Sequence, residues 1–405
     1  MEDAATRGQR IARARRRRGL SQSALAGLVG RSESWLSQVE RGVKALDSHS
    51  VLGNLARVLG VDVEELTGGE PEIHRATRYS AAREIERAMM RYEALDAAID
   101  GREGRPSDLE NLRRGIRRAN ALYQATRYDE VGGLLPRLIR SAEAAARMCL
   151  PRDRPAVHAV RAEVYQATTA LLSRVGEPQL AWTAGDRSVT AAEHAEAEIL
   201  MAVGAYRLGH AFIRRRRTAE AKDLVMVAAH ALERTMKRRA QPEQLSMWGS
   251  LHLVAATAAA VDFDRAEVDR FLGEARVAAE RLNGDRNDHW TAFGPTNVRI
   301  HEVSTAVAVG DAGLAVEAGE ALDVSELSGG LIGRRCQIYL DLAWAYAQQR
   351  HDAAAVNQLL GAERLAPELV RYDDRTHELL ATLLRREHRP STPELRPLAR
   401  RAGAI

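Results

Sequence analysis

The residues most able to do chemistry in this sequence are cations gathered near its N-terminus. Between Arg7 and Lys44, ten Arg and Lys residues stand against two acids, Glu33 and Glu40, although the chain of 405 residues carries a formal net charge of only +4. Such a local excess of positive charge favours a polyanionic partner. The four arginines at 15–18 leave a second interpretation open, because basic side chains at a helix end are often solvated and offset the helix dipole.

No catalytic motif accompanies these cations. The sequence has no His-Glu-x-x-His, nucleophile elbow or Walker loop, and the glycine pairs at 132–133 and 329–330 are isolated turns. Asp288 and His289 could contribute to a metal site, but a surface turn explains them more simply. Cys149 and Cys336 lie far apart and fit small core residues better than a redox pair or a zinc site. We therefore expect no enzyme activity, no cofactor and no metal.

The composition points to a helical protein outside the membrane. Apolar residues make up 45% of the chain, aromatic residues only 4%, and alanine is abundant, which suits closely packed helices. The first ten residues contain no apolar core of a signal peptide, and the longest nearly apolar run, 251–261, is too short to span a bilayer. We expect a soluble, cytoplasmic protein that does not bind membranes.

Turn and capping residues divide the first seventy residues into short helices. Gly19, Gly30 and Gly42 can end helices, and Ser21 and Ser32 can cap the helices that follow. The expected helices cover 8–18, 22–29 and 33–41, followed by a helix after Asp47 and Ser48 and a last turn opened by the capping box of Asp62 and Glu65. Two short helices joined by a glycine turn inside such a cluster are the plan of a helix-turn-helix module.

Residues 20–42, LSQSALAGLVGRSESWLSQVERG, resemble the XRE family of helix-turn-helix regulators, the lambdoid-repressor or Cro type. The resemblance extends through Leu-Gly-Val-Asp at 59–62 and covers about residues 7–68. It implies a five-helix, lambda-repressor-like domain whose third helix enters the DNA major groove.

The resemblance also implies roles for individual residues. Glu33, Ser34, Ser37 and Gln38 would face base edges, where a Gln can pair with adenine and a Glu can accept from cytosine. Gln22, Arg41 and Lys44 would contact phosphates, and a pair between Arg15 and Glu40 would be structural. Arg31 departs from the family, which usually has an apolar residue after the turn glycine. Trp35 fits packing better than base contact, and Ser37 could be a plain surface residue. The full expected DNA-binding set is Gln22, Arg31, Ser32, Glu33, Ser34, Trp35, Ser37, Gln38, Arg41 and Lys44.

The rest of the chain carries a repeat. Residues 337–367 have Tyr, Leu, Ala, Tyr, Ala, Leu, Ala and Pro at the eight consensus offsets of a tetratricopeptide (TPR) repeat. Weaker copies align when the central small position is used as an anchor; the anchors are Val131, Ala181, Ala221, Val268, Ala315 and Ala355. We expect an all-α chain with a DNA-binding domain at 1–70, a linker at 71–82 and a right-handed TPR-like solenoid at 83–405. An all-helical domain of another kind is the alternative.

A solenoid of this kind offers a concave surface lined by the first helix of each hairpin. The whole chain resembles TPR-bearing XRE regulators of actinobacteria, similar in plan to the peptide-sensing quorum regulators of Gram-positive bacteria, which implies a peptide or small-molecule effector. The expected effector contacts are Asn120, Tyr123, Gln166, Tyr206, His210, Asn297, His301 and Trp344, with Glu163 and Thr257 also facing inward. Asn297 and His301, beside the turn-rich segment 283–301, are preferred, although a helix cap and a surface histidine would explain them equally well.

Together these features predict a transcriptional regulator that binds double-stranded DNA at a pseudo-palindromic operator as a homodimer and responds to an effector. The alternative is a TPR scaffold that binds a partner protein and for which DNA binding is secondary.

Overall fold

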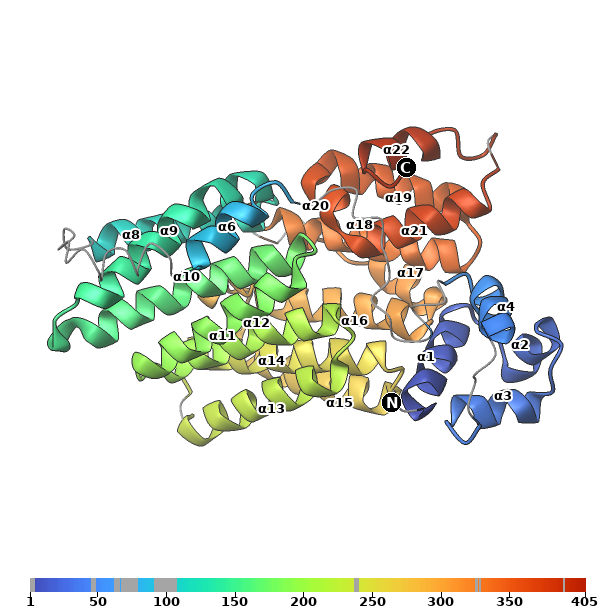
Figure 1. Ribbon diagram of the computed structural model, residues 1–405, viewed down its shortest axis with the longest axis horizontal. Helices are drawn as coiled ribbons and strands as arrows, with labels where there is room; N and C mark the ends of the chain where they lie inside the picture. Colours follow the sequence, from blue (N-terminus) through green and yellow to red (C-terminus); the bar gives the residue numbers. More distant parts are fainter. Residues whose placement is uncertain are drawn as a thin grey trace.

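The computed structural model describes residues 4–44, 49–61, 66, 79–90, 108–236, 240–324, 327, 329–388 and 390–405. All regular structure in these segments is helical, with no strand, as the composition predicted. Four N-terminal helices form a head, and the remaining helices form an elongated body of stacked helical hairpins (Figure 1). None of the helices in these segments is both long and apolar enough to cross a membrane.

The head contains α1 (Ala4–Arg17), α2 (Gln22–Leu28), α3 (Glu33–Glu40) and α4 (His49–Leu59). The predicted N-caps are confirmed, because the Ser21 hydroxyl accepts from the Ala24 amide at 3.0 Å and the Ser32 hydroxyl accepts from the Trp35 amide at 3.2 Å. Gly30 has φ +67°, a left-handed conformation that costs other residues strain, and it turns the chain between α2 and α3. The expected capping box at Asp62 and Glu65 lies outside the described residues.

The body begins at α6 and ends at α22. Its helices are α6 (Ala82–Met89), α8 (Leu109–Gln124), α9 (Tyr128–Met148), α10 (Arg154–Arg174), α11 (Pro178–His194), α12 (Glu198–Arg214), α13 (Thr218–Thr235), α14 (Pro242–Val261), α15 (Arg265–Leu282), α16 (Pro295–Val309), α17 (Ala312–Glu320), α18 (Ile332–Gln348), α19 (Asp352–Leu365), α20 (Pro367–Tyr372), α21 (Asp374–Arg385) and α22 (Leu395–Arg401). Short 3₁₀ turns lie at Pro151–Asp153 and Asp288–Trp290.

The predicted repeat register is confirmed by the positions of the six anchors. Each anchor, from Val131 on α9 to Ala355 on α19, is the fourth residue of the second helix of its hairpin and is buried. The turn before each of these helices contains a residue with positive φ two positions ahead of the helix, for example Thr126, Phe263 and Gly310. A small residue at the anchor lets the second helix approach the first, and the left-handed residue reverses the chain between them.

The first helices of successive hairpins also pack against one another, in the order α8, α10, α12, α14, α16 and α18. This row forms the inner layer of the body, and α14 at its centre is buried on nearly every face. The two ends of the array meet, because α18 contacts α8 and α20 contacts α9. Tyr79, in the segment that the sequence assigns to the linker, is buried there with its ring 5.4 Å from that of Tyr372.

Candidate nucleic-acid interface

The exposed polar side chains of the head gather at the start of α3. Glu33 and Ser34 are exposed in its first turn, while Ser37 and Gln38 are half-buried on its next turns. In Figure 1, α2 and α3 lie on the side of α1 that faces away from the body. The first turn of α3 therefore presents its free amides and these side chains at the surface of the head.

A buried network fixes the position of α3 relative to α1 and α2. The Arg15 guanidinium donates to the two Glu40 carboxylate oxygens at 2.6 and 2.8 Å and to the Leu20 carbonyl at 2.7 Å. The Gln22 amide donates to the same carboxylate at 2.7 Å. The structural role predicted for the Arg15–Glu40 pair is confirmed, and Gln22, predicted as a phosphate contact, also belongs to this network.

The other predicted contacts flank α3. Exposed Arg31 places its guanidinium carbon 5.6 Å from the centre of the Trp35 ring, and Trp35 itself is half-buried against the head core. The Ser32 hydroxyl is occupied as the N-cap of α3. Exposed Arg41 donates to the Ser37 carbonyl at 3.2 Å, and Lys44 is exposed. The cations thus lie at both ends of α3.

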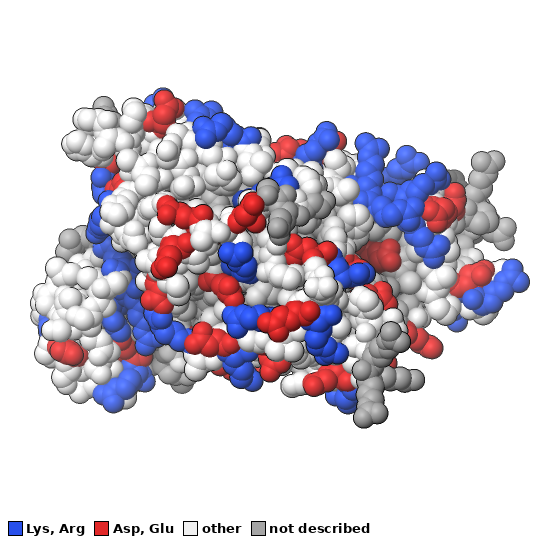
Figure 2. Space-filling model, turned by 180° about the vertical axis from the view of Figure 1, so that it is seen from behind, with Lys and Arg blue, Asp and Glu red and all other residues white. Residues whose placement is uncertain are grey.

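Positive charge continues from the head onto the body. The pKa of Arg18 is lowered by burial and by the nearby guanidinium groups of Arg385, Arg350 and Arg386, all three from the body. Figure 2 shows basic side chains along the boundary between the head and the body, and a second group over α8 and α9. Like charges held this close repel one another and raise the positive potential of this surface.

The head contacts the body through the turn between α14 and α15. Arg13 on α1 forms an ion pair with Asp262 at 3.0 Å, and Asp262 also accepts from the Thr218 hydroxyl at 2.8 Å. The Arg16 guanidinium carbon lies 5.8 Å from the centre of the Phe263 ring. These contacts join α1, on the inner side of the head, to a turn of the body.

The structure brings together four of the predicted effector residues. Tyr206 and His210 on α12 pack edge to face, with ring centres 4.8 Å apart. His301 on α16 is buried, so it is not a surface histidine, and its Nδ1 lies 2.9 Å from the Asn297 carbonyl. Asn297 is only 2% exposed, and its Oδ1 has no hydrogen-bond partner among the described residues.

The other four lie apart from this group or have structural partners. The Asn120 amide donates to the Ile116 carbonyl of its own helix, and the Gln166 amide donates to the Leu200 carbonyl at 2.9 Å. Tyr123 packs against Tyr128, with ring centres 5.5 Å apart. Trp344 is half-buried, and the guanidinium carbon of Arg375 lies 5.9 Å from its ring centre.

Sequence reasoning missed the cations that accompany these residues. Arg174, Arg207 and Arg334 lie on α10, α12 and α18, helices of the inner layer. Arg174 and Arg214 each place a guanidinium nitrogen 3.4 Å from buried Asp373. Burial opposes ionisation of Asp373, but Arg214 and Arg174 outweigh it and hold its pKa below the ordinary value. The available signal was a charged residue in the first helix of a hairpin, but arginine is so frequent in this chain that its presence there does not single out a site.

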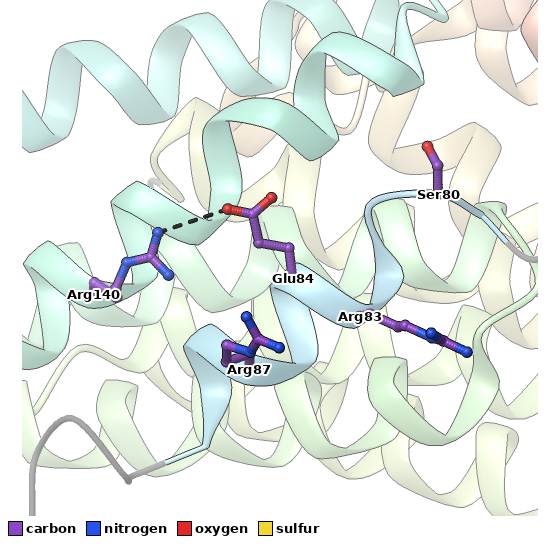
Figure 3. Close-up of a pocket in the computed structure, with 5 residues that line it drawn as sticks. All are labelled: Ser80, Arg83, Glu84, Arg87 and Arg140. Atoms are coloured by element: carbon purple, nitrogen blue, oxygen red, sulfur yellow. Dashed lines mark ion pairs between the residues drawn. The ribbon is translucent and has the colours of Figure 1, made fainter.

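An open hollow of about 610 Å³ lies between α6 and α9. Figure 3 shows its lining: Ser80, Arg83, Glu84 and Arg87 come from α6 and the turn before it, and Arg140 comes from α9. Arg140 lies 3.9 Å from Glu84. The arginines of α6 are exposed, so this hollow is a charged surface feature and not an enclosed site.

The groups considered for redox or metal chemistry have ordinary structural settings. Cys336 is buried, which raises the pKa of its thiol to about 12, and Cys149 is half-buried. Asp288 pairs with Arg286 at 2.7 Å, and His289 lies 3.7 Å from Glu243. Within the described segments, no three His, Cys, Asp or Glu residues are grouped as metal ligands.

The fold and the capped, exposed α3 define a helix-turn-helix domain joined to a helical-repeat body. Residues 8–67 match a family described as a helix-turn-helix domain; the match begins within α1 and includes α2, α3 and α4. Among solved structures, the chain is similar to PlcR of Bacillus thuringiensis, determined in complex with the peptide PapR7 and DNA; the identity is 15%, the match covers 87% of this chain and 99% of that chain, and the TM-score is 0.32. So low a TM-score means that the two chains do not superpose as wholes. No curated protein matches the sequence.

Proposed function

We propose that this chain is a sequence-specific DNA-binding transcriptional regulator and that α3 is its recognition helix. The observation that carries the proposal is the exposed first turn of α3, with Glu33 and Ser34 at the surface, in a segment that matches a helix-turn-helix domain. In such domains the N-terminal residues of the second helix of the motif contact base edges in the major groove. Lys44 and Arg41, beyond the end of α3, supply phosphate contacts, and Gln38 supplies base readout.

The proposed regulator acts as a homodimer on a pseudo-palindromic operator, and its body binds a peptide or small-molecule effector. Support for a dimer is the small size of one head, because a single module of this type buries little DNA surface and two half-sites supply the missing affinity. Support for an effector is the group of Tyr206, His210, Asn297 and His301 on inner helices α12 and α16, of which His210 is half-buried and the other three are buried.

The test is DNA binding by the purified full-length protein. Duplexes from the region upstream of its own gene and shuffled duplexes of equal composition are titrated at about 50 and 200 mM salt. We expect tighter binding to the upstream duplex at both concentrations. Light scattering of the protein on that duplex gives the number of chains bound. Equal affinity for both duplexes at both salt concentrations would exclude sequence-specific regulation and favour the scaffold alternative.

Two variants separate base contacts from phosphate contacts. Gln38→Ala should weaken binding to the upstream duplex by about 1–3 kcal/mol and leave binding to the shuffled duplex nearly unchanged. Lys44→Ala should weaken both by the same factor and reduce the salt slope by about 1. Arg281→Ala, an exposed cation on α15 of the body, is the control and should change neither.

A further inference from the structure

Two arginines from separate inner helices converge on one short stretch of chain. Arg207 on α12 points its Nη2 at the carbonyl oxygens of His289 and Trp290, at 3.3 and 3.4 Å. Arg334 on α18 points its Nη2 at the Thr291 carbonyl and at the Tyr206 hydroxyl, both at 3.4 Å. Three consecutive peptide carbonyls therefore face two guanidinium groups.

Neither guanidinium has a counterion. In the described part of the chain, no carboxylate oxygen lies within 4 Å of Arg207 or Arg334, and Glu243, which approaches His289, pairs with neither. Arg207 is only 8% exposed, and its Nε has no hydrogen-bond partner among the described residues. Burying a cation without a paired anion is costly, and uncharged carbonyls at 3.3–3.4 Å, beyond the usual N–H···O range, offset little of that cost.

The neighbouring titratable groups experience the same positive field. Burial and then Arg334 lower the pKa of His301 to about 3. Burial lowers the pKa of His210 well below its ordinary value, and Arg334, His301, Arg207 and Arg174 each lower it further. Both imidazoles are thus neutral near pH 7. His301 donates from Nδ1 to the Asn297 carbonyl, so its Nε2 is left as a hydrogen-bond acceptor. The unpartnered Oδ1 of Asn297 lies on α16, one turn before His301.

The stretch that the arginines hold is strained. His289, Trp290 and Ala292 have φ of +49°, +62° and +55°, values that residues with a side chain rarely adopt. The same loop is tied to the end of α8, because the Gln124 and Asn287 side chains exchange two hydrogen bonds at 2.9 Å. The loop thus crosses the inner layer from α8 past α12 to α18, and carbonyl contacts with the two arginines are part of what holds it there.

We propose that Arg207 and Arg334 form a binding site for an organic anion, a carboxylate- or phosphate-bearing effector, which replaces the carbonyls of residues 289–291 as their partner. The planar guanidinium groups can each present two N–H donors to such an anion. Neutral His210, neutral His301 and the Tyr206 hydroxyl offer hydrogen bonds to the rest of the ligand. This inference deepens the proposed function, since it names the chemical class of the effector.

The experiment uses thermal unfolding of the full-length protein with succinate and with inorganic phosphate as probes, each against sodium chloride of equal ionic strength. We expect one or both probes to raise the unfolding midpoint by about 2 °C at a concentration ten times the dissociation constant. The stronger probe distinguishes a carboxylate site from a phosphate site. The shift should vanish in the double variant Arg207→Gln, Arg334→Gln and persist in Arg281→Gln. No shift with either probe, or an equal shift in the double variant, overturns the proposal.

The midpoint without added anion distinguishes a ligand site from a structural role. If the two arginines serve to bind an anion, removing their charges relieves repulsion, and the double variant should unfold without added anion at the same or a higher temperature than the original chain. If they serve only to hold the carbonyls of residues 289–291, it should unfold several degrees lower, which overturns the proposal. A double variant that unfolds in no cooperative transition is replaced by Arg334→Gln alone, since Arg334 is half-buried.

DNA binding is measured on the same samples without added anion. The double variant should still bind the upstream duplex, because its changes leave the residues of the head intact. Failure of both proteins to bind DNA would defeat the proposed regulator while leaving the anion site standing. A protein that binds DNA but whose unfolding midpoint does not change with either anion would overturn the anion site and leave the proposed regulator standing.

Discussion

The buried pair of Arg15 and Glu40 gives the sharpest prediction for the head. Glu40→Ala removes the carboxylate that receives two hydrogen bonds from Arg15 and one from Gln22, all between 2.6 and 2.8 Å. The Arg15 side chain is 9% exposed and the Glu40 side chain 5%, so solvent cannot replace the lost carboxylate. Arg15 would keep one contact, with the Leu20 carbonyl.

The magnitude follows from the charge left behind. Removing one partner of a buried ion pair costs about 3–5 kcal/mol, because the other charge stays buried without compensation. A folded unit the size of this head has a total free energy of unfolding of roughly 3–9 kcal/mol at typical values per residue. Glu40→Ala should therefore bring the head close to unfolding, although Glu40 itself is not predicted to touch DNA.

Hydrogen exchange of the full-length chain measures this locally. Peptides from α1, α2 and α3 should lose roughly 200- to 5,000-fold of their protection in Glu40→Ala, while peptides from α14 should be unchanged. Glu33→Ala removes an exposed acid from the same helix and should change protection by less than about threefold, as expected of a surface site.

The double variant Arg15→Met, Glu40→Leu tests the reasoning itself. It removes both charges and replaces them with apolar side chains, so most of the protection should return, less about 1 kcal/mol for the lost acceptor of Gln22. A fall in protection under tenfold in Glu40→Ala would refute the argument. A double variant as poorly protected as the single one would refute it equally, because the cost would then not come from an unpaired charge.

Three further predictions concern the body. Gly310 has φ +90° with open space where a Cβ would lie, so Gly310→Ala should lower the free energy of unfolding by about 1 kcal/mol through backbone strain. Glu196 has φ +53°, so Glu196→Gly should leave the free energy of unfolding unchanged or raise it by up to about 1 kcal/mol. Denaturant titrations check both, and changes of the same sign in the two variants would contradict the backbone argument. Asp262→Asn weakens the ion pair with Arg13, so small-angle scattering should report a larger radius of gyration, and an unchanged curve would argue against this contact as the tether of the head. The pKa of His301 is about 3 when folded and about 6.5 when unfolded, so below pH 6.5 the unfolded chain binds a proton that the folded chain does not. The free energy of unfolding should therefore fall by about 2 kcal/mol between pH 7.5 and pH 5 because of His301. His301→Gln should remove this contribution, and the same dependence of stability on pH in the variant would contradict the prediction.

Helices α2 and α3 of the head could be predicted to within one residue because their signals are local, whereas α1 begins at Ala4, four residues before the predicted start. The Ser21 and Ser32 hydroxyls each accept from the amide three residues ahead and so cap the helix that begins at the next residue, and Gly30 takes the left-handed turn that its position required. The Arg15–Glu40 pair spans 25 residues, and only the resemblance to a known family brought it within reach. The DNA-contacting roles of Glu33, Gln38 and Lys44 stay predictions until binding is measured.

The positions of the repeats in the body could be predicted from the sequence, but the contacts between side chains inside the array could not. The anchors fell at the fourth residue of their helices because packing two helices closely demands a small side chain at a fixed place. The loop that follows α15 could not be placed, since its contacts join residues up to 166 positions apart and depend on how far the array curves. Arg207 and Arg334 are separated by more than a hundred residues, so nothing in the sequence around either one indicates that they contact consecutive carbonyls of the same loop.

Helix α15 connects the turn that contacts the head with the loop that Arg207 and Arg334 contact, two features that the sequence did not reveal. Its N-terminal end adjoins the turn of Asp262 and Phe263 that holds α1 of the head, and its C-terminal end leads into the loop that Arg207 and Arg334 hold. Its 18 residues span about 27 Å and contain no proline. A rigid helix transmits a displacement at one end to the other, whereas a flexible linker would absorb it. Under the proposal above, an anion that released the loop would act at one end of the helix whose other end adjoins the contact between head and body, so an effector at that site would need no direct contact with the head.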